Sequence, residues 1–206
     1  MRNRGVLLVR FVALWNAMRL RGDPVCEFMR ITRRYTEKHR AYHTLTHIAD
    51  CLKEFDRVRN TMRNPVMMEL AFWYHDVIYN PKAKDNEEKS AQYARKSLFR
   101  FGTSARLIED VTALILATKH HAVDLSDRDR AAFIDIDLSI LGSDSNRFAV
   151  YERGVRREYN FVPDDAYREG RGKFFDGMLA RDRIFATRHF QNRFENRARH
   201  NLVAFR

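Results

Sequence analysis

Apolar residues recur at helical spacing along most of the chain, and no segment keeps a sustained alternation of apolar and polar positions. Spacings of three and four residues place side chains on one face of a helix. Four such stripes are Leu8, Phe11, Val12, Trp15 and Met18; Ile48, Leu52 and Phe55; Leu107, Val111, Leu114 and Thr118; and Phe148, Tyr151, Val155 and Tyr159. The pattern predicts an all-α protein of about eight to ten helices.

Helix start and stop signals lie between the predicted helices. The start signals are Asp23-Pro24, Asn64-Pro65, the capping-box pair Asp85 and Glu88, and the capping-box pair Ser126 and Asp129. The stop signals are Asn80-Pro81, Gly102 and Gly142. Because no repeat or linker interrupts the chain, we predict a single domain over 1–206. Its core motifs fall in 40–142, and the C-terminal helices, in 143–206, pack on them.

The most informative segment is the largely apolar run from Met67 to Tyr79, which the dipeptide His75-Asp76 interrupts. The run is long enough to form a buried helix. A carboxylate buried without a partner costs several kcal/mol, as an order of magnitude. A metal ion would satisfy the imidazole and the carboxylate together. The dipeptide therefore raises the question of further ligands.

Three other segments offer ligands, and each of them alone has an ordinary structural explanation. His43 and His47 flank a helix start, and His120-His121 ends the stripe that begins at Leu107. A hydrogen-bonded core histidine or a salt-bridged aspartate would explain any one of these segments. Together they place imidazoles and carboxylates on or beside apolar faces of several helices, which favours a shared metal.

The third segment, 135–141, holds two aspartates, Asp135 and Asp137. Asp137 falls on the stripe of Phe133, Ile140 and Leu141, so its carboxylate points toward the expected core. Asp135 falls on a less apolar side. We therefore predict Asp137 as the ligand and keep Asp135 as the alternative.

His47, His75-Asp76 and Asp137 resemble the His…His-Asp…Asp signature of the HD superfamily of metal-dependent phosphohydrolases. Several further motifs are similar to a bacterial subfamily of predicted HD hydrolases whose reaction is not settled. These motifs are Tyr42-His43, Tyr74 to Tyr79, Asp85 to Ala91, Ile134 to Gly142, Arg157 to Tyr159, Tyr167 to Arg171 and Arg197 to Leu202. The resemblance runs from about residue 40 almost to the C-terminus. It implies an all-helical fold with one or two metals in a central cleft.

The resemblance and the residues together give a set of expected roles. We predict His47, His75, Asp76 and Asp137 as ligands of one divalent ion, which is Mn, Fe, Co, Ni, Mg or Zn. A second metal stays open because His120-His121 lies between the dipeptide and the last aspartate. Such an ion lowers the pKa of a bound water and polarises a phosphoryl oxygen.

The remaining expected roles concern the water and the substrate. Glu88 is expected to be occupied in the capping box, which leaves Glu87 to orient or deprotonate the water. His121 is predicted as a second catalytic residue, and His43 and Lys119 as substrate-binding residues. The predicted activity is hydrolysis of phosphomonoesters or phosphodiesters, with nucleotides among the candidate substrates.

Two other functions remain open at this point. Some HD proteins are di-iron oxygenases, which need about six protein ligands. The other is a non-catalytic, metal-stabilised module that binds nucleic acid or a protein partner. The formal charge of +11 suits nucleic acid, but the excess is +7 over residues 1–40 and +5 over residues 150–206, around a central segment at −1. We therefore expect a small phosphorylated substrate rather than nucleic acid.

The cellular location follows from the same sequence. No run reaches the roughly 18 consecutive apolar residues that span a bilayer. Arg10 interrupts the short apolar segment near the N-terminus, and no cleavage site follows it. We predict a cytoplasmic protein in which Cys26 and Cys51 are reduced.

Overall fold

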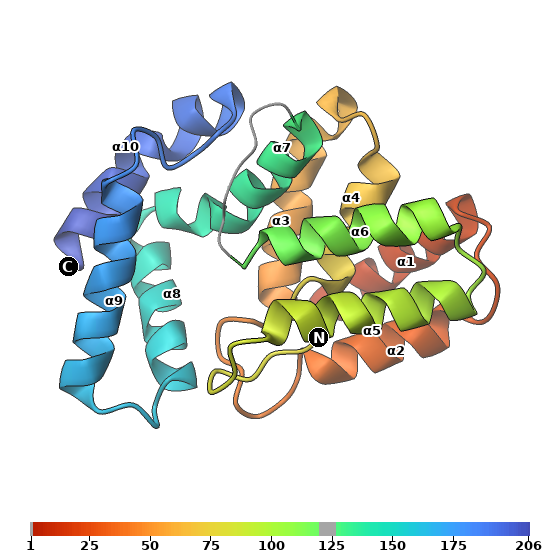
Figure 1. Cartoon of the computed structure of the whole chain (residues 1–206), viewed down its shortest axis with the longest axis horizontal. Helices are drawn as coiled ribbons and strands as arrows, with labels where there is room; N and C mark the ends of the chain where they lie inside the picture. Colours follow the sequence, from red (N-terminus) through yellow and green to blue (C-terminus); the bar gives the residue numbers. More distant parts are fainter. Residues whose placement is uncertain (1, 120–126) are drawn as a thin grey trace. The chain divides into compact units, whose positions relative to one another are not determined.

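The computed structural model describes residues 2–119 and 127–206, and this part of the chain forms ten α-helices, two short 3-10 helices and no strand (Figure 1). The prediction of an all-α protein with eight to ten helices is confirmed. The chain groups into two compact units, residues 1–122 and residues 123–206. The single-domain arrangement stays a prediction.

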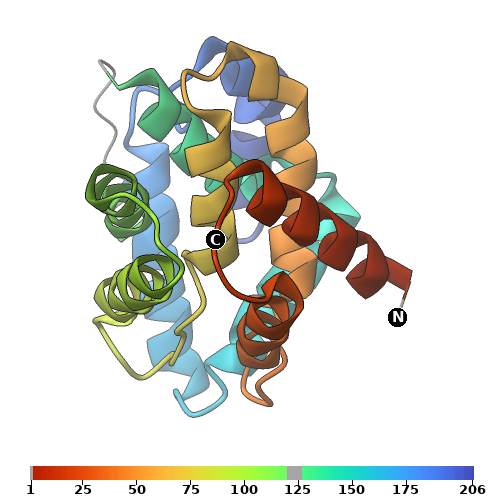
Figure 2. The ribbon, with the colours of Figure 1, turned by 90° about the vertical axis from the view of Figure 1, so that its right-hand side faces the viewer.

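In the first unit, the helix that ends at the His75-Asp76 dipeptide occupies a central position. Its helices are α1 (Arg2–Ala17), α2 (Pro24–Arg34), α3 (Leu45–Val58), η1 (Arg59–Thr61), α4 (Pro65–Tyr74), α5 (Asn86–Arg100) and α6 (Ala105–Ala117). α4 packs against α3, α5 and α6, and the neighbouring α5 and α6 lie side by side (Figures 1 and 2). α4 is thus surrounded by other helices, which accounts for its nearly uniform apolar sequence.

Large aromatic side chains hold α1, α2 and α4 together. Phe11 of α1 meets Trp73 of α4 edge-on, with ring centroids 5.2 Å apart, and Phe28 of α2 packs against both rings. All three side chains are at most 1% exposed. Burying a side chain of this size stabilises a fold by roughly 1.5–3 kcal/mol. This cluster anchors the helix that carries the dipeptide.

The second unit is also helical. Its helices are α7 (Arg128–Asp137), η2 (Leu138–Gly142), α8 (Ser145–Glu158), α9 (Asp164–Leu179) and α10 (Arg188–Ala204). η2 packs tightly on α10, because a Cβ atom added at Gly142 would collide with the side chain and backbone of Phe194. Glycine is therefore required there for close approach, beyond its predicted role as a stop signal.

Two of the predicted helix starts form as expected. The Asp23 side chain accepts hydrogen bonds from the backbone N–H groups of Val25 and Cys26, and Asn64 accepts one from Met67. In both helices a proline occupies the first turn. These caps satisfy backbone donors that the first turn leaves unpaired. The predicted stop at Gly102 is confirmed by its φ of +78°, a conformation that favours glycine.

The predicted capping box at Asp85 does not form. Asp85 precedes α5 but makes no side-chain cap, and its carboxylate pairs with Lys89 at 2.9 Å. Ser126 lies outside the described residues, and Asp127 caps α7 by accepting from the N–H of Arg130. Sequence spacing alone does not show with which of several polar neighbours the side chain of a helix-cap residue will interact.

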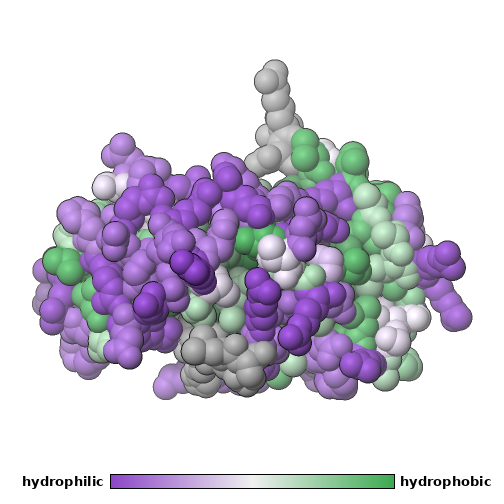
Figure 3. All heavy atoms as spheres, turned by 90° about the horizontal axis from the view of Figure 1, so that it is seen from above, coloured by the Kyte–Doolittle hydropathy of each residue, from purple (hydrophilic) through white to green (hydrophobic). Residues whose placement is uncertain are grey.

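Polar side chains cover much of the face shown in Figure 3, with hydrophobic side chains exposed among them. Val6 and Val9 of α1 are among the exposed hydrophobic residues, at 68% and 71%. Within the described part of the chain, no helix combines the length and the apolar character needed to cross a bilayer.

Candidate metal centre

The start of α3 directs His47 into the interior of the first unit. Thr44 caps the helix by accepting from the N–H of Thr46, and Ile48 and Leu52 are at most 1% exposed. His47 shares the first turn and is 4% exposed. The predicted helix start and the inward direction of this imidazole are therefore both confirmed.

The other two predicted ligands of this unit, His75 and Asp76, directly follow the end of α4. Every residue from Met67 to Tyr74 is buried, and the helix ends directly before His75. His75 is 1% exposed, and the Asp76 side chain is 19% exposed. The dipeptide thus lies in an apolar interior, where both side chains need polar partners.

Three ligand atoms of these residues form a small triangle. His47 Nε2 and His75 Nε2 lie 3.0 Å apart, and Asp76 Oδ2 lies 3.2 Å from the latter and 3.5 Å from the former. Ligands bound at about 2.1 Å to one ion are about 3.0 Å apart at right angles and about 3.4 Å apart in a tetrahedron. The triangle therefore has the dimensions of one face of a metal coordination shell.

The hydrogen bond behind the His75 ring directs its lone pair into this triangle, and the contact behind the His47 ring allows the same arrangement. His75 Nδ1 lies 3.0 Å from the carbonyl oxygen of Phe72, which can only accept, so Nδ1 carries the hydrogen. In the neutral ring, Nε2 then carries a lone pair. The Tyr42 hydroxyl oxygen lies 3.2 Å from His47 Nδ1 and can accept from it in the same way. Partners of this kind fix the ligating tautomer in metal sites.

The Asp76 carboxyl is held in its ionised form. Burial raises its pKa, but the charge and hydrogen bond of His75, with further contributions from His43 and His47, bring the pKa well below the ordinary value. That positive charge belongs to protonated imidazoles; with neutral rings, a divalent cation between the three groups would supply it instead. Such a set of ligands suits a divalent cation.

Cys51 is a potential ligand that the sequence analysis missed. Its Sγ lies 3.7 Å from Nδ1 and 3.8 Å from Nε2 of His47, and the ligand atoms of His47, Cys51 and His75 all lie within 4.8 Å of one another. The available signal was the spacing of four residues between His47 and Cys51, which puts both on one face of α3. A soft sulfur donor favours zinc or iron over magnesium.

His43 lies beside the triangle as part of an aromatic group. Its ring stacks on Tyr79 with centroids 4.2 Å apart, and it stands edge-on to Tyr42 at 4.9 Å. The centroids of His43 and His47 are 6.0 Å apart. The structure therefore brings His43 close to the candidate ligands, and its role toward substrate stays a prediction.

Glu88 and Lys119 pair with each other, which corrects the reasoning that selected Glu87. The Glu88 carboxylate is not in a capping box but forms an ion pair with Lys119, beyond the end of α6. The Lys119 ammonium attracts the nearby carboxylate more strongly than the helix start does. Glu87 is half-buried in the first turn of α5. The water-handling role of Glu87 and the phosphate-binding role of Lys119 stay predictions.

In the second unit, the expected burial of the two aspartates is reversed. Asp135 is fully buried, whereas Asp137, the last residue of α7, is only half-buried. The prediction from the apolar stripe was wrong because residues 131–136 of α7 are all buried, so no single face marks the core.

Both oxygens of the Asp135 carboxylate accept hydrogen bonds within that unit. One oxygen accepts from the N–H of Ala186 at 2.7 Å, and the other accepts from the N–H and hydroxyl of Thr187 at 2.7 and 2.6 Å. Burial raises the pKa of Asp135 to about 6, and these hydrogen bonds oppose that rise. Asp135 therefore secures the segment before α10, and the role of Asp137 as a ligand stays a prediction.

His120 and His121 lie outside the described residues, so the predicted catalytic role of His121 stays a prediction. Comparison with protein-family models, with curated proteins and with solved structures gave no match. The chain is thus an all-helical protein in which buried His47, Cys51 and His75, with Asp76 beside them, have the geometry to hold a metal ion.

Proposed function

We propose that this protein is a metal-dependent hydrolase of phosphate esters, with His47, His75 and Asp76 as ligands and Asp137 of the second unit as a further ligand. One observation carries the proposal: two imidazole nitrogens and one carboxylate oxygen lie 3.0–3.5 Å apart in an apolar interior. The proposal for Asp137 is supported by its place in the motif, because three donors from Ala186 and Thr187 already hold the carboxylate of Asp135, the alternative ligand.

The donor set narrows the choice of metal. Two imidazoles and carboxylate oxygens accept Mn, Fe, Co, Ni, Mg or Zn. The nearby sulfur of Cys51 shifts this preference toward zinc, iron or cobalt. When bound, such an ion supplies an acidified water and polarises a phosphoryl oxygen.

The other residues would act on the water and the substrate. Glu87 would orient the attacking water and accept its proton. His43, in its aromatic group with Tyr79, would contact the substrate beside the ligands. Lys119 would bind phosphate by exchanging its present partner, Glu88, for the substrate. His121 would protonate the leaving oxygen.

The test combines metal content with turnover. The protein is stripped with a chelator, reloaded separately with each of the candidate metals, and analysed for bound metal by mass spectrometry. It is then assayed with p-nitrophenyl phosphate, bis-p-nitrophenyl phosphate and a panel of nucleotides. We expect about one metal per chain and hydrolysis of at least one ester class.

Matched variants distinguish the loss of the metal site from general effects of a substitution on the protein. His75→Ala and Asp76→Ala should lose both bound metal and hydrolysis, whereas His200→Ala, which removes an exposed imidazole on α10, should retain both. Hydrolysis that survives both of the first two substitutions would overturn the proposal. Two irons per chain with oxygen consumption would favour an oxygenase instead.

A further inference from the structure

Arg40 is a buried cation next to the candidate metal centre. It lies between α2 and α3, and its side chain is 0% exposed. Burying a guanidinium is unfavourable unless its donors are satisfied. The contacts of Arg40 therefore show what this residue does in the fold.

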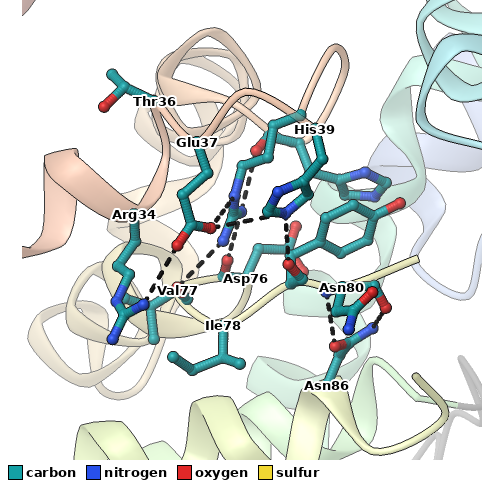
Figure 4. Close-up of polar contacts among 12 residues, drawn as sticks. Arg34, Thr36, Glu37, His39, Asp76, Val77, Ile78, Asn80 and Asn86 are labelled. Carbon is teal, nitrogen blue, oxygen red and sulfur yellow. Dashed lines mark hydrogen bonds and ion pairs between the residues drawn. The ribbon is translucent and has the colours of Figure 1, made fainter. Parts of the chain in front are cut away.

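The Arg40 guanidinium donates mainly to backbone carbonyl groups. Nη1 donates to the carbonyl oxygens of Asp76 at 2.8 Å and His43 at 3.1 Å, and Nη2 donates to that of Val77 at 3.1 Å. Nε donates to the carboxylate of Glu37 at 3.2 Å. Figure 4 labels three residues whose oxygen atoms accept these hydrogen bonds: Glu37, Asp76 and Val77.

The end of α4 explains why a cation is needed at this place. A positive charge is favourable near the C-terminal end of a helix, and carbonyl groups buried just beyond that end need donors. Asp76 and Val77 directly follow the C-cap residue His75, in the protein interior. Arg40 supplies the missing donors to both.

Two aromatic rings hold the guanidinium in a fixed orientation. It lies 5.0 Å from the ring centroid of Tyr35 and 5.4 Å from that of Tyr79. A planar group in such surroundings can donate in several fixed directions at once, which an ammonium group cannot do. The orientation of Arg40 is thus set before any ligand binds.

We propose that Arg40 is a positioning residue of the metal centre: its guanidinium holds the backbone of His43 and Asp76 in register, so that the Asp76 carboxylate faces His47 and His75. This inference rests on the proposed metal site. Arg40 contacts the backbone of a ligand rather than the metal. Removal of its donors would leave His75 and Asp76 in the sequence but loosen the direction of the carboxylate.

The test uses cobalt(II), whose visible absorption spectrum reports the geometry of its ligands. Arg40→Met removes all five N–H donors but keeps an apolar side chain, and Arg40→Lys keeps the charge without the planar fork. Arg34→Met is the matched control, because Arg34 donates to the same Glu37 carboxylate from an exposed position. Circular dichroism checks that each variant remains helical, and titration gives the cobalt dissociation constant.

We expect Arg40→Met to weaken cobalt binding about 10- to 100-fold, the usual effect of losing a partner behind a metal ligand. The visible spectrum should change as well, which a loss of stability elsewhere would not cause. Arg40→Lys should fall between Arg40→Met and the wild type, and Arg34→Met should match the wild type in both measurements.

The outcomes distinguish this inference from the proposed function. If the wild-type protein does not bind cobalt, the metal site itself fails and the inference fails with it. If the wild type binds cobalt and a helical Arg40→Met or Arg40→Lys variant binds it equally, with the same spectrum, only the role of Arg40 is wrong. Loss of helical structure in both variants would also overturn it, since Arg40 would then be needed for folding rather than for positioning.

Discussion

The Nε2 atoms of His47 and His75 lie 3.0 Å apart, although 28 residues separate them in the chain. The hydrogen bond from His75 Nδ1 to the Phe72 carbonyl leaves His75 Nε2 with a lone pair, and a hydrogen bond from His47 Nδ1 to the Tyr42 hydroxyl would do the same for His47 Nε2. Two lone pairs at this distance repel each other unless a proton or a cation lies between them. The pair therefore links the fold of the first unit directly to the proposed metal chemistry.

Removal of the metal should lower the thermal stability of the protein. A ligand present at 100 times its dissociation constant stabilises the folded state by about 2.7 kcal/mol. For a chain of this size that corresponds to a shift in melting temperature of about 5–10 °C. Calorimetry with and without chelator measures it. In His75→Ala the shift should vanish, and a chelator effect of equal size in that variant would count against the site.

Substitutions of Asp135 and Asp137 should have opposite effects on stability and on metal binding, although only one residue separates the two positions. Asp135→Asn puts an amide where three donors converge, so we expect the free energy of unfolding of the metal-free protein to fall by about 2–4 kcal/mol. Asp137→Asn should change that quantity by less than about 1 kcal/mol and weaken metal binding at least about tenfold. Denaturant unfolding and metal titration test both. The reverse pattern would make Asp135 the ligand.

Cys51 should be visible as a sulfur ligand in the cobalt-loaded protein. Its Sγ lies 3.8 Å from His47 Nε2, close to the spacing of about 3.6 Å expected for sulfur and nitrogen on one tetrahedral ion. We expect a near-ultraviolet sulfur-to-cobalt charge-transfer band that disappears in Cys51→Ser. Cys26→Ser, which alters an exposed cysteine, should keep the band. A wild-type spectrum without this band would exclude Cys51 as a ligand.

Glu87 and Glu88 offer a matched pair for the water-handling role. Glu87→Gln should lower kcat about 10²- to 10⁴-fold, the usual contribution of a general base, without loss of bound metal. Glu88→Gln breaks the ion pair with Lys119 and should leave kcat close to that of the wild type. Steady-state kinetics with the best substrate measures both effects. Equal kcat values for Glu87→Gln and the wild type would remove Glu87 from the reaction.

The sequence correctly predicted the parts of the site that depend on the residues of a single helix. The buried α4 and its terminal dipeptide were predictable because an ionisable pair in an apolar run needs a partner. The same holds for His47, which shares a face with Ile48 and Leu52. The spacing of His47 and Cys51 carried a similar signal, but Cys51 was considered only for its redox state.

The remaining features depend on contacts between distant segments. The donors that occupy Asp135 lie 51 and 52 residues further along the chain, so helical phase could not reveal them. Arg40 lies in a segment without a helical pattern. It donates to backbone carbonyl groups, and because every residue has one, the sequence does not show which of them Arg40 contacts. The partner of Glu88 is 31 residues away. Such pairings follow from tertiary packing rather than from local pattern.

Anomalous diffraction from crystals of the metal-loaded protein tests the central claim most directly. The account predicts an anomalous peak within about 2.0–2.3 Å of His47 Nε2, His75 Nε2 and an Asp76 carboxylate oxygen. A catalytically active protein whose metal peak lies away from these three atoms would contradict it.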